Sequence, residues 1–328
     1  MFKISPPIAN PVWLAPMAGI SDLPYRRIMK EFGAGLVFTE MVSANGLIRD
    51  GKRTMELLRS VPEERPLAVQ LFGDDPAVVA QAVELASPYA EVIDLNMGCP
   101  VKKVVRSGAG SALLRDIDKT ARMLAAARRA TSLPLTIKIR SGWDAEHINF
   151  LTIGRIAEQE GIDAITLHPR TRSQGFGGHA AWEQIRALKQ SLNIPVIGSG
   201  DIFTPDNSLA MLQQTGCDAI MIGRGGYGNP WLIRDTLALL AGQPLPPEPL
   251  PEERFDIARR HLDYAVETFG ARKALCDMRK HLCWYSRGMS GAAGFRSQVN
   301  HCQTIEGLRL TLDQYFITAA QAQAGELL

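Results

Sequence analysis

Residues 135–168 read LTIKIRSGWDAEHINFLTIGRIAEQEGIDAITLH, and this stretch decides the fold. It begins with an apolar, β-branched run at residues 135–139 and reaches a second such run at residues 164–167. Between the two runs, residues 149–160 alternate polar and apolar side chains at helical spacing. Near-continuous apolar strands that alternate with helices are typical of a parallel sheet covered on both faces. The stretch therefore predicts one strand–helix–strand unit.

Similar apolar runs recur along the first 222 residues, with helix-like segments between them. They lie at residues 12–14, 35–38, 67–71, 92–95, 135–139, 164–167, 196–198 and 219–222. Eight such units predict a closed (β/α)8 TIM barrel. An open, doubly wound sheet is the alternative. Its dinucleotide-binding form is disfavoured because no Gly-x-Gly-x-x-Gly follows the first strand.

The pattern changes after the last predicted strand. Residues 242–251 read GQPLPPEPLP, a proline-rich run that neither a helix interior nor a central strand tolerates. Beyond it, residues 252–328 have helical periodicity without a clear strand. The sequence predicts a barrel at residues 1–241, a semi-rigid linker at 242–251 and a small C-terminal helical domain at 252–328.

The composition excludes several classes of protein. A chain of 328 residues with 46% hydrophobic and 21% charged residues is neither disordered nor fibrous, and it can bury a substantial core. No apolar run approaches the roughly 20 residues of a membrane span. The 5 cysteines form neither a disulfide framework nor a zinc motif. We expect no secretory signal peptide, because the first residues, MFKISPP, do not show a basic segment followed by an apolar stretch. We expect a cytoplasmic monomer that binds no metal and no membrane.

Polar groups or glycines follow nearly every predicted strand. In a barrel, the carboxyl ends of the strands meet at one mouth, where active sites lie. Buried polar groups need partners, so a set of them at one mouth indicates a bound ligand, with a rim that only faces water as the alternative. The groups at these ends are Pro16, Met17, Ala18, Glu40, Gln70, Asn96, Lys138, Arg140, His168, Ser199, Gly200, Asp201, Gly223 and Arg224.

Two glycine-rich turns follow the seventh and eighth strands, at residues 198–201 (GSGD) and 223–226 (GRGG). Barrels often bind phosphate at this place. Glycine lets backbone N–H groups approach an anion closely, and Arg224 offers a charge that can bind two oxygens at once. These turns predict a phosphate site, although glycines that only reverse the chain are the alternative.

Residues 96–100 (NMGCP) place a thiol at the end of the fourth strand. Gly98 and Pro100 predict a tight turn that presents Cys99. A free thiol with a pKa of about 8.5 is mostly protonated at neutral pH and can donate a proton. Because the sequence shows no evident histidine base for it, we interpret Cys99 as an acid, with a structural cysteine as the alternative.

These motifs resemble those of the tRNA-dihydrouridine synthases. Residues 15–22 (APMAGISD) resemble the first-strand motif of that family, and residues 93–111 resemble its signature. Residues 69–73, 138–140, 168–172, 198–202, 221–225 and 279–285 are similar to its other blocks. The string MGCPVKKV at 97–104 looks most like the B-type bacterial branch. Ser199 stands where many members have Asn.

The resemblance implies an FMN enzyme that reduces uridine in the D-loop of tRNA to 5,6-dihydrouridine, with NADPH as electron donor. Cys99 would give the proton to C5, while Asn96 and Arg140 would orient the uracil. The residues implied to bind the cofactor are Pro16, Met17, Ala18, Gln70, Lys138, His168, Ser199, Gly200, Asp201, Gly223 and Arg224. An FMN barrel that reduces a free pyrimidine or another small molecule is the alternative function.

Basic residues gather in the predicted helical domain. Between residues 271 and 301 the single acid is Asp277, whereas Arg and Lys recur seven residues apart. On one helix this spacing would make a basic stripe opposite apolar positions. The stripe residues are Arg272, Lys273, Arg279, Lys280 and Arg287. A charged stripe is usually a solvated face, but with the family resemblance we expect it to bind tRNA phosphates. We interpret Trp284 and Tyr285 as core residues.

Overall fold

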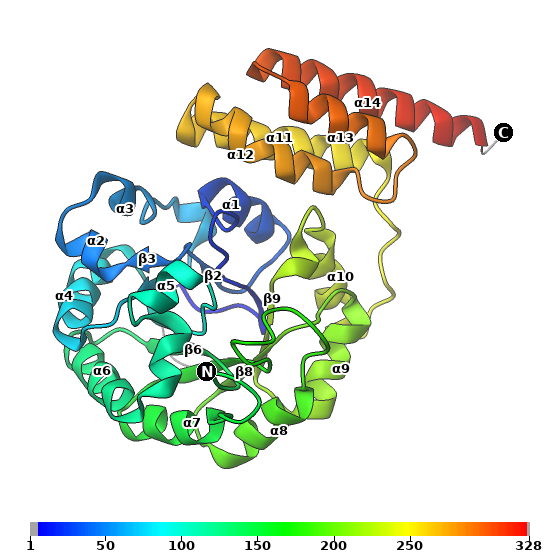
Figure 1. Ribbon diagram of the computed structural model, residues 1–328. Helices are drawn as coiled ribbons and strands as arrows, with labels where there is room; N and C mark the ends of the chain where they lie inside the picture. Colours follow the sequence, from blue (N-terminus) through cyan, green and yellow to red (C-terminus); the bar gives the residue numbers. More distant parts are fainter. Residues whose placement is uncertain (1–5, 327–328) are drawn as a thin grey trace.

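The computed structural model describes residues 6–326, with side chains as far as residue 319, and it forms a closed barrel (Figure 1). The paired strands are parallel and follow the order β1-β9-β8-β7-β6-β5-β4-β2, with β3 pairing beside β4. The ring is completed where Trp13 bridges to Leu36 and the Leu14 N–H donates to the Leu36 carbonyl at 2.9 Å. The predicted TIM barrel is confirmed, and its closure excludes the open doubly wound sheet.

The strands agree with the predicted runs to within two residues at each end. They are β1 (Val12–Leu14), β2 (Val37–Phe38), β3 (Val42–Ser43), β4 (Leu67–Phe72), β5 (Val92–Met97), β6 (Leu135–Arg140), β7 (Ala164–His168), β8 (Val196–Ser199) and β9 (Ala219–Ile222). The additional strand β3 was not predicted, because two residues are too few to show an alternating pattern.

Helices cover the outside of the barrel and form the C-terminal part. The α-helices are α1 (Leu23–Glu31), α2 (Ala44–Ile48), α3 (Lys52–Glu56), α4 (Pro76–Ala86), α5 (Lys102–Arg106), α6 (Ile117–Arg129), α7 (Phe150–Gln159), α8 (Trp182–Ser191), α9 (Pro205–Thr215), α10 (Trp231–Leu240), α11 (Pro251–Phe269), α12 (Ala271–Tyr285), α13 (Ala292–His301) and α14 (Ile305–Glu326). The short 3₁₀ helices are η1 (Pro62–Glu64), η2 (Ser87–Tyr89), η3 (Gly110–Arg115) and η4 (Arg224–Gly226).

Local signals in the sequence explain where helices begin. The Asp75 side chain accepts hydrogen bonds from the N–H groups of Ala77 and Val78, and Pro76 opens α4. Such an N-cap satisfies donors that have no partner within the helix. Proline is favoured in the first turn because its missing N–H is not needed there.

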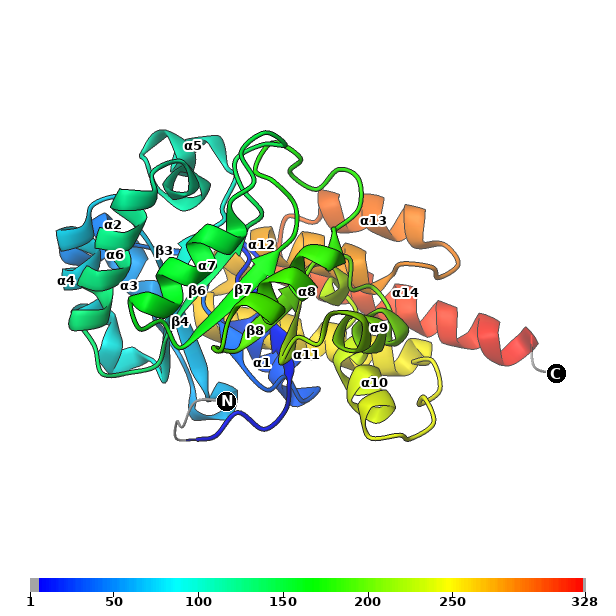
Figure 2. The ribbon, with the colours of Figure 1, turned by 90° about the horizontal axis from the view of Figure 1, so that it is seen from below.

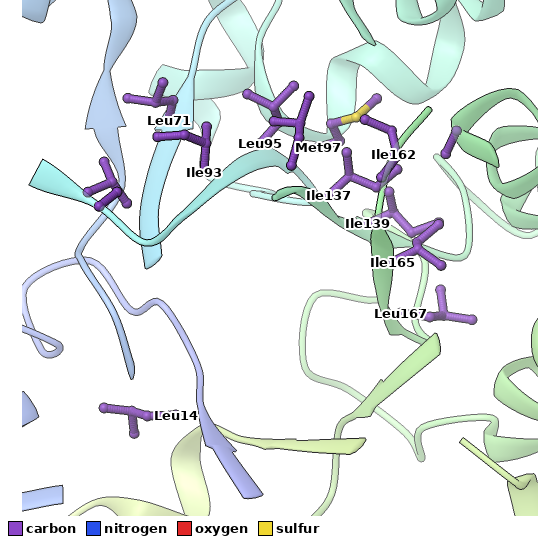
Figure 3. Close-up of a cluster of buried hydrophobic side chains, with 14 of the residues drawn as sticks. Leu14, Leu71, Ile93, Leu95, Met97, Ile137, Ile139, Ile162, Ile165 and Leu167 are labelled. Carbon is purple, nitrogen blue, oxygen red and sulfur yellow. The ribbon is translucent and has the colours of Figure 1, made fainter. Parts of the chain in front are cut away.

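The alternation of side chains along each strand builds two different environments. Outward-facing side chains pack against the helices, as Figure 3 shows for Leu71, Ile93, Leu95, Ile137 and Ile139 among others. The deepest inward-facing layer is also apolar and includes Trp13, Ala68, Val92, Ala164 and Ile197. Successive side chains on a strand point to opposite faces. The polar residues at alternate positions, which are Gln70, Asp94, Asn96, Thr136 and Lys138, therefore project into the barrel above this layer.

Helices α11 to α14 pack on one another and against the outside of the barrel (Figure 1). Their core includes Leu262 and Met278 and is joined by Ile28 of α1 and Trp231 of α10. Residues 243–250 have no helix or strand, and α11 begins at Pro251. The proline-rich segment thus ends one residue earlier than predicted. No helix within residues 6–326 is long and apolar enough to traverse a bilayer.

A buried ion pair joins α1 to the segment before β4. Arg26 is 1% exposed and Glu64 is 0% exposed. Arg26 Nε and Nη2 donate to the two carboxylate oxygens of Glu64 at 2.7 and 2.9 Å. The guanidinium also donates to the carbonyls of Ser21 and Arg59. Because both charged side chains are buried, removing one partner leaves the other charge buried without its counter-ion.

We predict that Glu64→Ala lowers the free energy of unfolding by about 3–5 kcal/mol, because it leaves the charge of Arg26 buried without its carboxylate partner. Urea denaturation followed by circular dichroism measures the loss. The control is Lys189→Ala, which removes a partly exposed ion pair with Asp218 and should cost at most about 1 kcal/mol. A loss for Glu64→Ala no larger than that of the control would contradict the prediction.

Candidate active site

A cavity of about 330 Å³ opens at the carboxyl ends of the strands. The loops after β6 and β7 and helix α5 rise on this side of the barrel, while residues 6–11, which precede β1, lie on the other (Figure 2). The predicted site residues that line the cavity are Pro16, Met17, Ala18, Asn96, Cys99, Lys138, Arg140, His168, Ser199, Gly200, Asp201, Gly223 and Arg224. Thus the barrel gathers residues that are more than 200 positions apart in the sequence into one space.

Cys99 lies at the cavity wall in a turn that is fixed by hydrogen bonds. The Cys99 N–H donates to Asn96 Oδ1 at 2.9 Å, and the Ser111 hydroxyl donates to the Cys99 carbonyl at 2.9 Å. The side chain is 8% exposed. Burial raises the pKa of the Cys99 thiol and outweighs the lowering by the Val101 N–H and the charge of Arg140. The thiol is therefore in its acid form at neutral pH.

Two cationic side chains of β6 lie beside this thiol. Burial lowers the pKa of Lys138 to about 8, helped by the charge of Arg140, while Asp94 opposes the shift. Burial also lowers the pKa of Arg140 to about 10. Arg140 Nε donates to the Gly98 carbonyl at 3.0 Å, so this side chain braces the turn that carries Cys99. Its predicted contact with the uracil stays a prediction.

The far end of the cavity combines glycine backbone with basic side chains. Gly200 has a φ of 116°, and an added Cβ would lie 3.0 Å from atoms of Ala180 and His168, so only glycine fits there. The Arg224 guanidinium lies 4.5 Å above the centre of the Phe176 ring. Burial, followed by the charge of Lys138, holds the pKa of His168 well below its ordinary value, so its imidazole is neutral.

Asp201 organises the arginines at this end. One carboxylate oxygen accepts from Arg170 at 2.7 Å and from the Ala180 N–H at 2.8 Å, and the other lies 3.4 Å from Arg224. Burial acts to raise the pKa of Asp201, but the hydrogen bonds from Arg170 and Ala180 and the arginine charges lower it overall. The carboxylate is thus ionised and positions Arg170 and Arg224. Its predicted contact with a cofactor stays a prediction.

The two halves of the cavity fit the two ends of FMN. Pro16, Met17 and Ala18 supply a largely apolar wall for a flat ring. An added Cβ at Gly223 would come no closer than 3.7 Å to other atoms, so the backbone there is open to an approaching group. Arg224 and the glycine backbone at Gly200 and Gly223 suit a phosphate. The phosphate site at the two glycine turns stays a prediction.

Gln70 lies below the cavity and is completely buried. Its Nε2 donates to Asp94 at 2.7 Å, and its Oε1 accepts from Asn96 Nδ2 at 2.8 Å. Both ends of the amide are thus used inside the barrel. The predicted contact of Gln70 with the flavin ring stays a prediction, as does that of Asn96 with the uracil.

Several lining residues were missed by sequence reasoning. They are Met41, Val101, Phe176, Phe203 and Tyr227. Tyr227 stacks on Trp284 of α12, with ring centres 4.3 Å apart and an interplanar angle of 12°. Such residues lie in loops, which carry no periodic signal. Tyr285 is 1% exposed and is confirmed as a core residue, whereas Trp284 is half-buried and contacts the barrel.

The predicted basic stripe is only partly helical. Helix α12 ends at Tyr285, so Arg287 lies beyond it, and the five residues do not form one stripe on a helix. The Ser286 hydroxyl donates to the Cys283 carbonyl at 3.0 Å, and Gly288 adopts a φ of 76°, which turns the chain away. Arg287 instead lies over the Trp284 ring, near the cavity mouth.

The other basic residues of α12 differ in their surroundings. Arg272 and Lys273 are exposed, and Lys273 Nζ lies 2.6 Å from Asp277. Lys280 is half-buried, and Arg279 Nη2 donates to the Cys302 carbonyl at 2.5 Å. Lys273 also lines a second cleft of about 540 Å³ between α12 and the barrel. Arg279 therefore holds α12 to the end of α13, whereas Arg272 and Lys273 are exposed.

Comparisons with known proteins test the family resemblance of the motifs. Residues 13–321 match the family model described as "Dihydrouridine synthase (Dus)". The chain is 41% identical over 318 residues to "tRNA-dihydrouridine synthase B" of Pseudomonas aeruginosa, covering 94% of this chain and 93% of the relative. It is 42% identical over 311 residues to the protein of the same name from Xanthomonas campestris pv. campestris, with 94% and 93% covered. These matches confirm the resemblance that the motifs carried.

A similarity to a solved structure concerns the fold alone. A 6-hydroxypseudooxynicotine amine oxidase from Pseudomonas geniculata N1 superposes with a TM-score of 0.54 at 13% identity, over 71% of this chain and 47% of the oxidase.

Among the described residues, no three His, Cys, Asp or Glu side chains gather in a group that could hold a metal ion.

We predict that Cys99 in the native protein reacts slowly with iodoacetamide at pH 7, at least about tenfold more slowly than a solvent-accessible thiol, because the thiolate is the nucleophile and burial disfavours it. Cys276 is exposed and serves as the internal reference. Mass spectrometry of both peptides across a pH series gives the two rates. A Cys99 rate that levels off below pH 8 would show a lowered pKa and contradict the acid form.

Proposed function

The chain belongs to the dihydrouridine synthase family, and from this premise we propose that it reduces uridine in the D-loop of tRNA to 5,6-dihydrouridine. We propose FMN as the resident cofactor, NADPH as the electron donor and a monomer as the active form. The relatives at about 40% identity are named for tRNA, which favours this substrate over a free pyrimidine.

One observation carries the proposal. A single cavity contains the Cys99 thiol in its acid form, the cations Lys138 and Arg140 and, at its other end, glycine backbone beside Arg224. Reduction of a carbon–carbon double bond adjacent to a carbonyl needs a hydride on one carbon and a proton on the other. An acid beside a site for a flat ring and a phosphate supplies the protein's share of that reaction.

The residues divide the work as follows. When bound, FMN supplies the hydride that is added to C6 of the uracil, with electrons that come from NADPH. Cys99 Sγ donates its proton to C5 and is left as a thiolate, which the nearby positive charges of Arg140 and Lys138 stabilise. Lys138, held in the cavity wall, also favours negative charge on a bound ring. The apolar wall at Pro16–Ala18 excludes water.

The experiment that tests the function compares two substrates. Purified protein is analysed for released FMN and is then mixed with NADPH and either an unmodified tRNA transcript or free uridine. We expect dihydrouridine in the tRNA and none from uridine. Equal turnover of free uridine would favour the small-molecule alternative, and a protein that neither contains nor binds FMN would overturn the proposal.

We predict that Cys99→Ala separates the two half-reactions. Reduction of bound flavin by NADPH, seen as the loss of visible absorbance, should keep its rate because it needs no thiol proton. Reoxidation by tRNA should slow by about 10² or more, as expected when a positioned general acid is lost. Anaerobic stopped-flow absorbance measures both steps.

The control for this prediction is Cys276→Ala, which removes an exposed thiol of α12 and should alter neither rate. If Cys99→Ala slows both half-reactions equally, the thiol shapes the flavin site and does not act as the proton donor.

We also propose that the basic residues in and after α12 grip the tRNA backbone. Arg272 and Lys273 are exposed, Lys280 is partly so, and Arg287 lies beyond the helix end near the cavity mouth. We include Arg279 in this proposal, although its Nη2 is bonded to the Cys302 carbonyl. Phosphate contacts from such side chains fix the position of an RNA without reading its sequence.

We predict that replacing Lys273, Lys280 and Arg287 together by Gln weakens tRNA binding and flattens its salt dependence. Each lost phosphate contact changes the slope of log affinity against log salt by roughly 0.7–0.9, so three contacts change it by about two or more. Filter binding across a salt series gives the slope, and the FMN content should not change.

The matched control removes the same number of charges elsewhere, through Arg122, Arg129 and Arg155 to Gln. These exposed residues belong to α6 and α7, on the side of the barrel away from α12 (Figure 1). The slope of the control should stay near that of the wild type. Equal slopes for both triple variants would show that the α12 residues form an ordinary solvated surface.

A further inference from the structure

A chain of hydrogen bonds inside the barrel connects a buried carboxylate to the backbone of Cys99. The Thr136 hydroxyl donates to Asp94 Oδ1 at 2.5 Å, and Gln70 Nε2 donates to Asp94 Oδ2 at 2.7 Å. Asn96 Nδ2 donates to Gln70 Oε1 at 2.8 Å, and the Cys99 N–H donates to Asn96 Oδ1 at 2.9 Å. We call these contacts between Asp94, Gln70, Asn96 and Cys99 the amide relay.

The amide relay lies where water cannot replace a lost contact. Asp94 and Gln70 are 0% exposed, and Asn96 is 8% exposed. Asp94 and Asn96 project inward from β5, and Gln70 pairs with Asp94 across the β4–β5 boundary. An unpaired polar group at such a depth costs about 1–3 kcal/mol, so each member depends on its neighbour.

The two ends of the amide relay fix its direction. An ionised carboxylate only accepts hydrogen bonds, and a backbone N–H only donates. An amide side chain has one accepting oxygen and one donating nitrogen. Each amide in the relay therefore accepts one hydrogen bond at its oxygen and donates one from its nitrogen. With Asp94 as acceptor, Gln70 must turn its nitrogen toward Asp94, and Asn96 must turn its oxygen toward Cys99. If the acceptor were lost, Gln70 would no longer be oriented by Asp94, and Asn96 would be oriented from the Cys99 end alone. Asn96 would then be freer to rotate and to bring its nitrogen toward the Cys99 N–H.

The turn at Cys99 responds to the orientation of Asn96. Asn96 Oδ1 accepts from the N–H groups of both Gly98 and Cys99, at 3.3 and 2.9 Å. Two facing donors in place of these bonds would push the turn away from Asn96. The Cys99 side chain would then move with it, away from the place where a bound uracil needs the proton.

We propose that Asp94 is a positioning residue for Cys99, acting through the accepting oxygen that orients the amides of Gln70 and Asn96. This inference rests on the proposed function only in giving Cys99 the role of proton donor; the effect of Asp94 on the turn does not depend on it. Asp94 itself does not line the cavity surface described above.

The alternative role for Asp94 is to balance the positive charge of Lys138, and two substitutions separate the roles. Asp94→Leu and Asp94→Asn both remove the negative charge. Asp94→Asn retains an oxygen that accepts from Gln70, because its nitrogen can donate to the Thr136 hydroxyl, which accepts as well as donates. Asp94→Leu retains no acceptor. Positioning therefore predicts different behaviour, and charge balance predicts equal behaviour.

The main readout is alkylation of Cys99 in the native protein, with Cys276 as internal reference, because it requires neither catalysis nor tRNA. We expect Asp94→Leu to raise the Cys99 rate at least about tenfold, since a displaced turn exposes the thiol, whereas Asp94→Asn stays within about threefold of wild type. In stopped-flow measurements, the rate of flavin reoxidation by tRNA should be about tenfold to 10²-fold lower in Asp94→Leu than in Asp94→Asn.

Thermal denaturation and FMN content verify folding of each variant. If Asp94→Leu does not fold, Gln70→Met breaks the amide relay at its next link and leaves the Asp94 charge in place, and it should raise Cys99 alkylation to the same extent. Equal Cys99 rates in Asp94→Leu and Asp94→Asn, or a wild-type rate in Gln70→Met, would overturn the positioning role. A wild-type protein inactive on tRNA would overturn the proposed function while leaving the alkylation test valid.

Discussion

The short contact between β1 and residues 35–36 closes the barrel. It thereby determines the surroundings of every inward-facing side chain. The Gly35 N–H donates to the Val12 carbonyl at 2.8 Å, and a Cβ at Gly35 would lie 2.3 Å from the Asn10 carbonyl oxygen. Only glycine permits this approach. Once the ring is closed, polar groups inside it can bond only to one another or to a molecule that enters at the mouth.

Burial then opposes charge of both signs at the floor of the cavity and in the layer beneath it. It raises the pKa of Asp94 to about 6 and lowers that of Lys138 to about 8, so each group is easier to neutralise than in water. Arg170 and Arg224 share the single carboxylate of Asp201. The cavity therefore has an excess of positive charge, which an anionic ligand would offset. The same field stabilises a thiolate at Cys99 after it has given up its proton.

The sequence contained most of the fold and the identity of the cavity residues, because both depend on local signals. Apolar runs predicted all of the barrel strands except β3, and the ends of those strands supplied 13 of the 24 residues that line the cavity. Contacts between distant segments had no such signal. The stack of Tyr227 on Trp284 and the end of α12 before Arg287 follow from tertiary packing. Similarly, Gln70 was recognised as a polar strand end, but the alternation of β5 alone does not reveal its bond to Asp94.

The pairing of β1 with β9 has a consequence for how the chain matures. Val12 lies opposite Ile220. Strand β1, which is synthesised first, therefore has one unpaired edge until β9 has been synthesised. Contacts of such long sequence separation form slowly, and an unpaired strand edge can pair with other chains meanwhile. Helices α11 to α14 emerge later still and pack on α1 and α10. Nascent chains that stop short of β9 therefore carry an open strand edge, which makes them prone to aggregation until β9 pairs with β1.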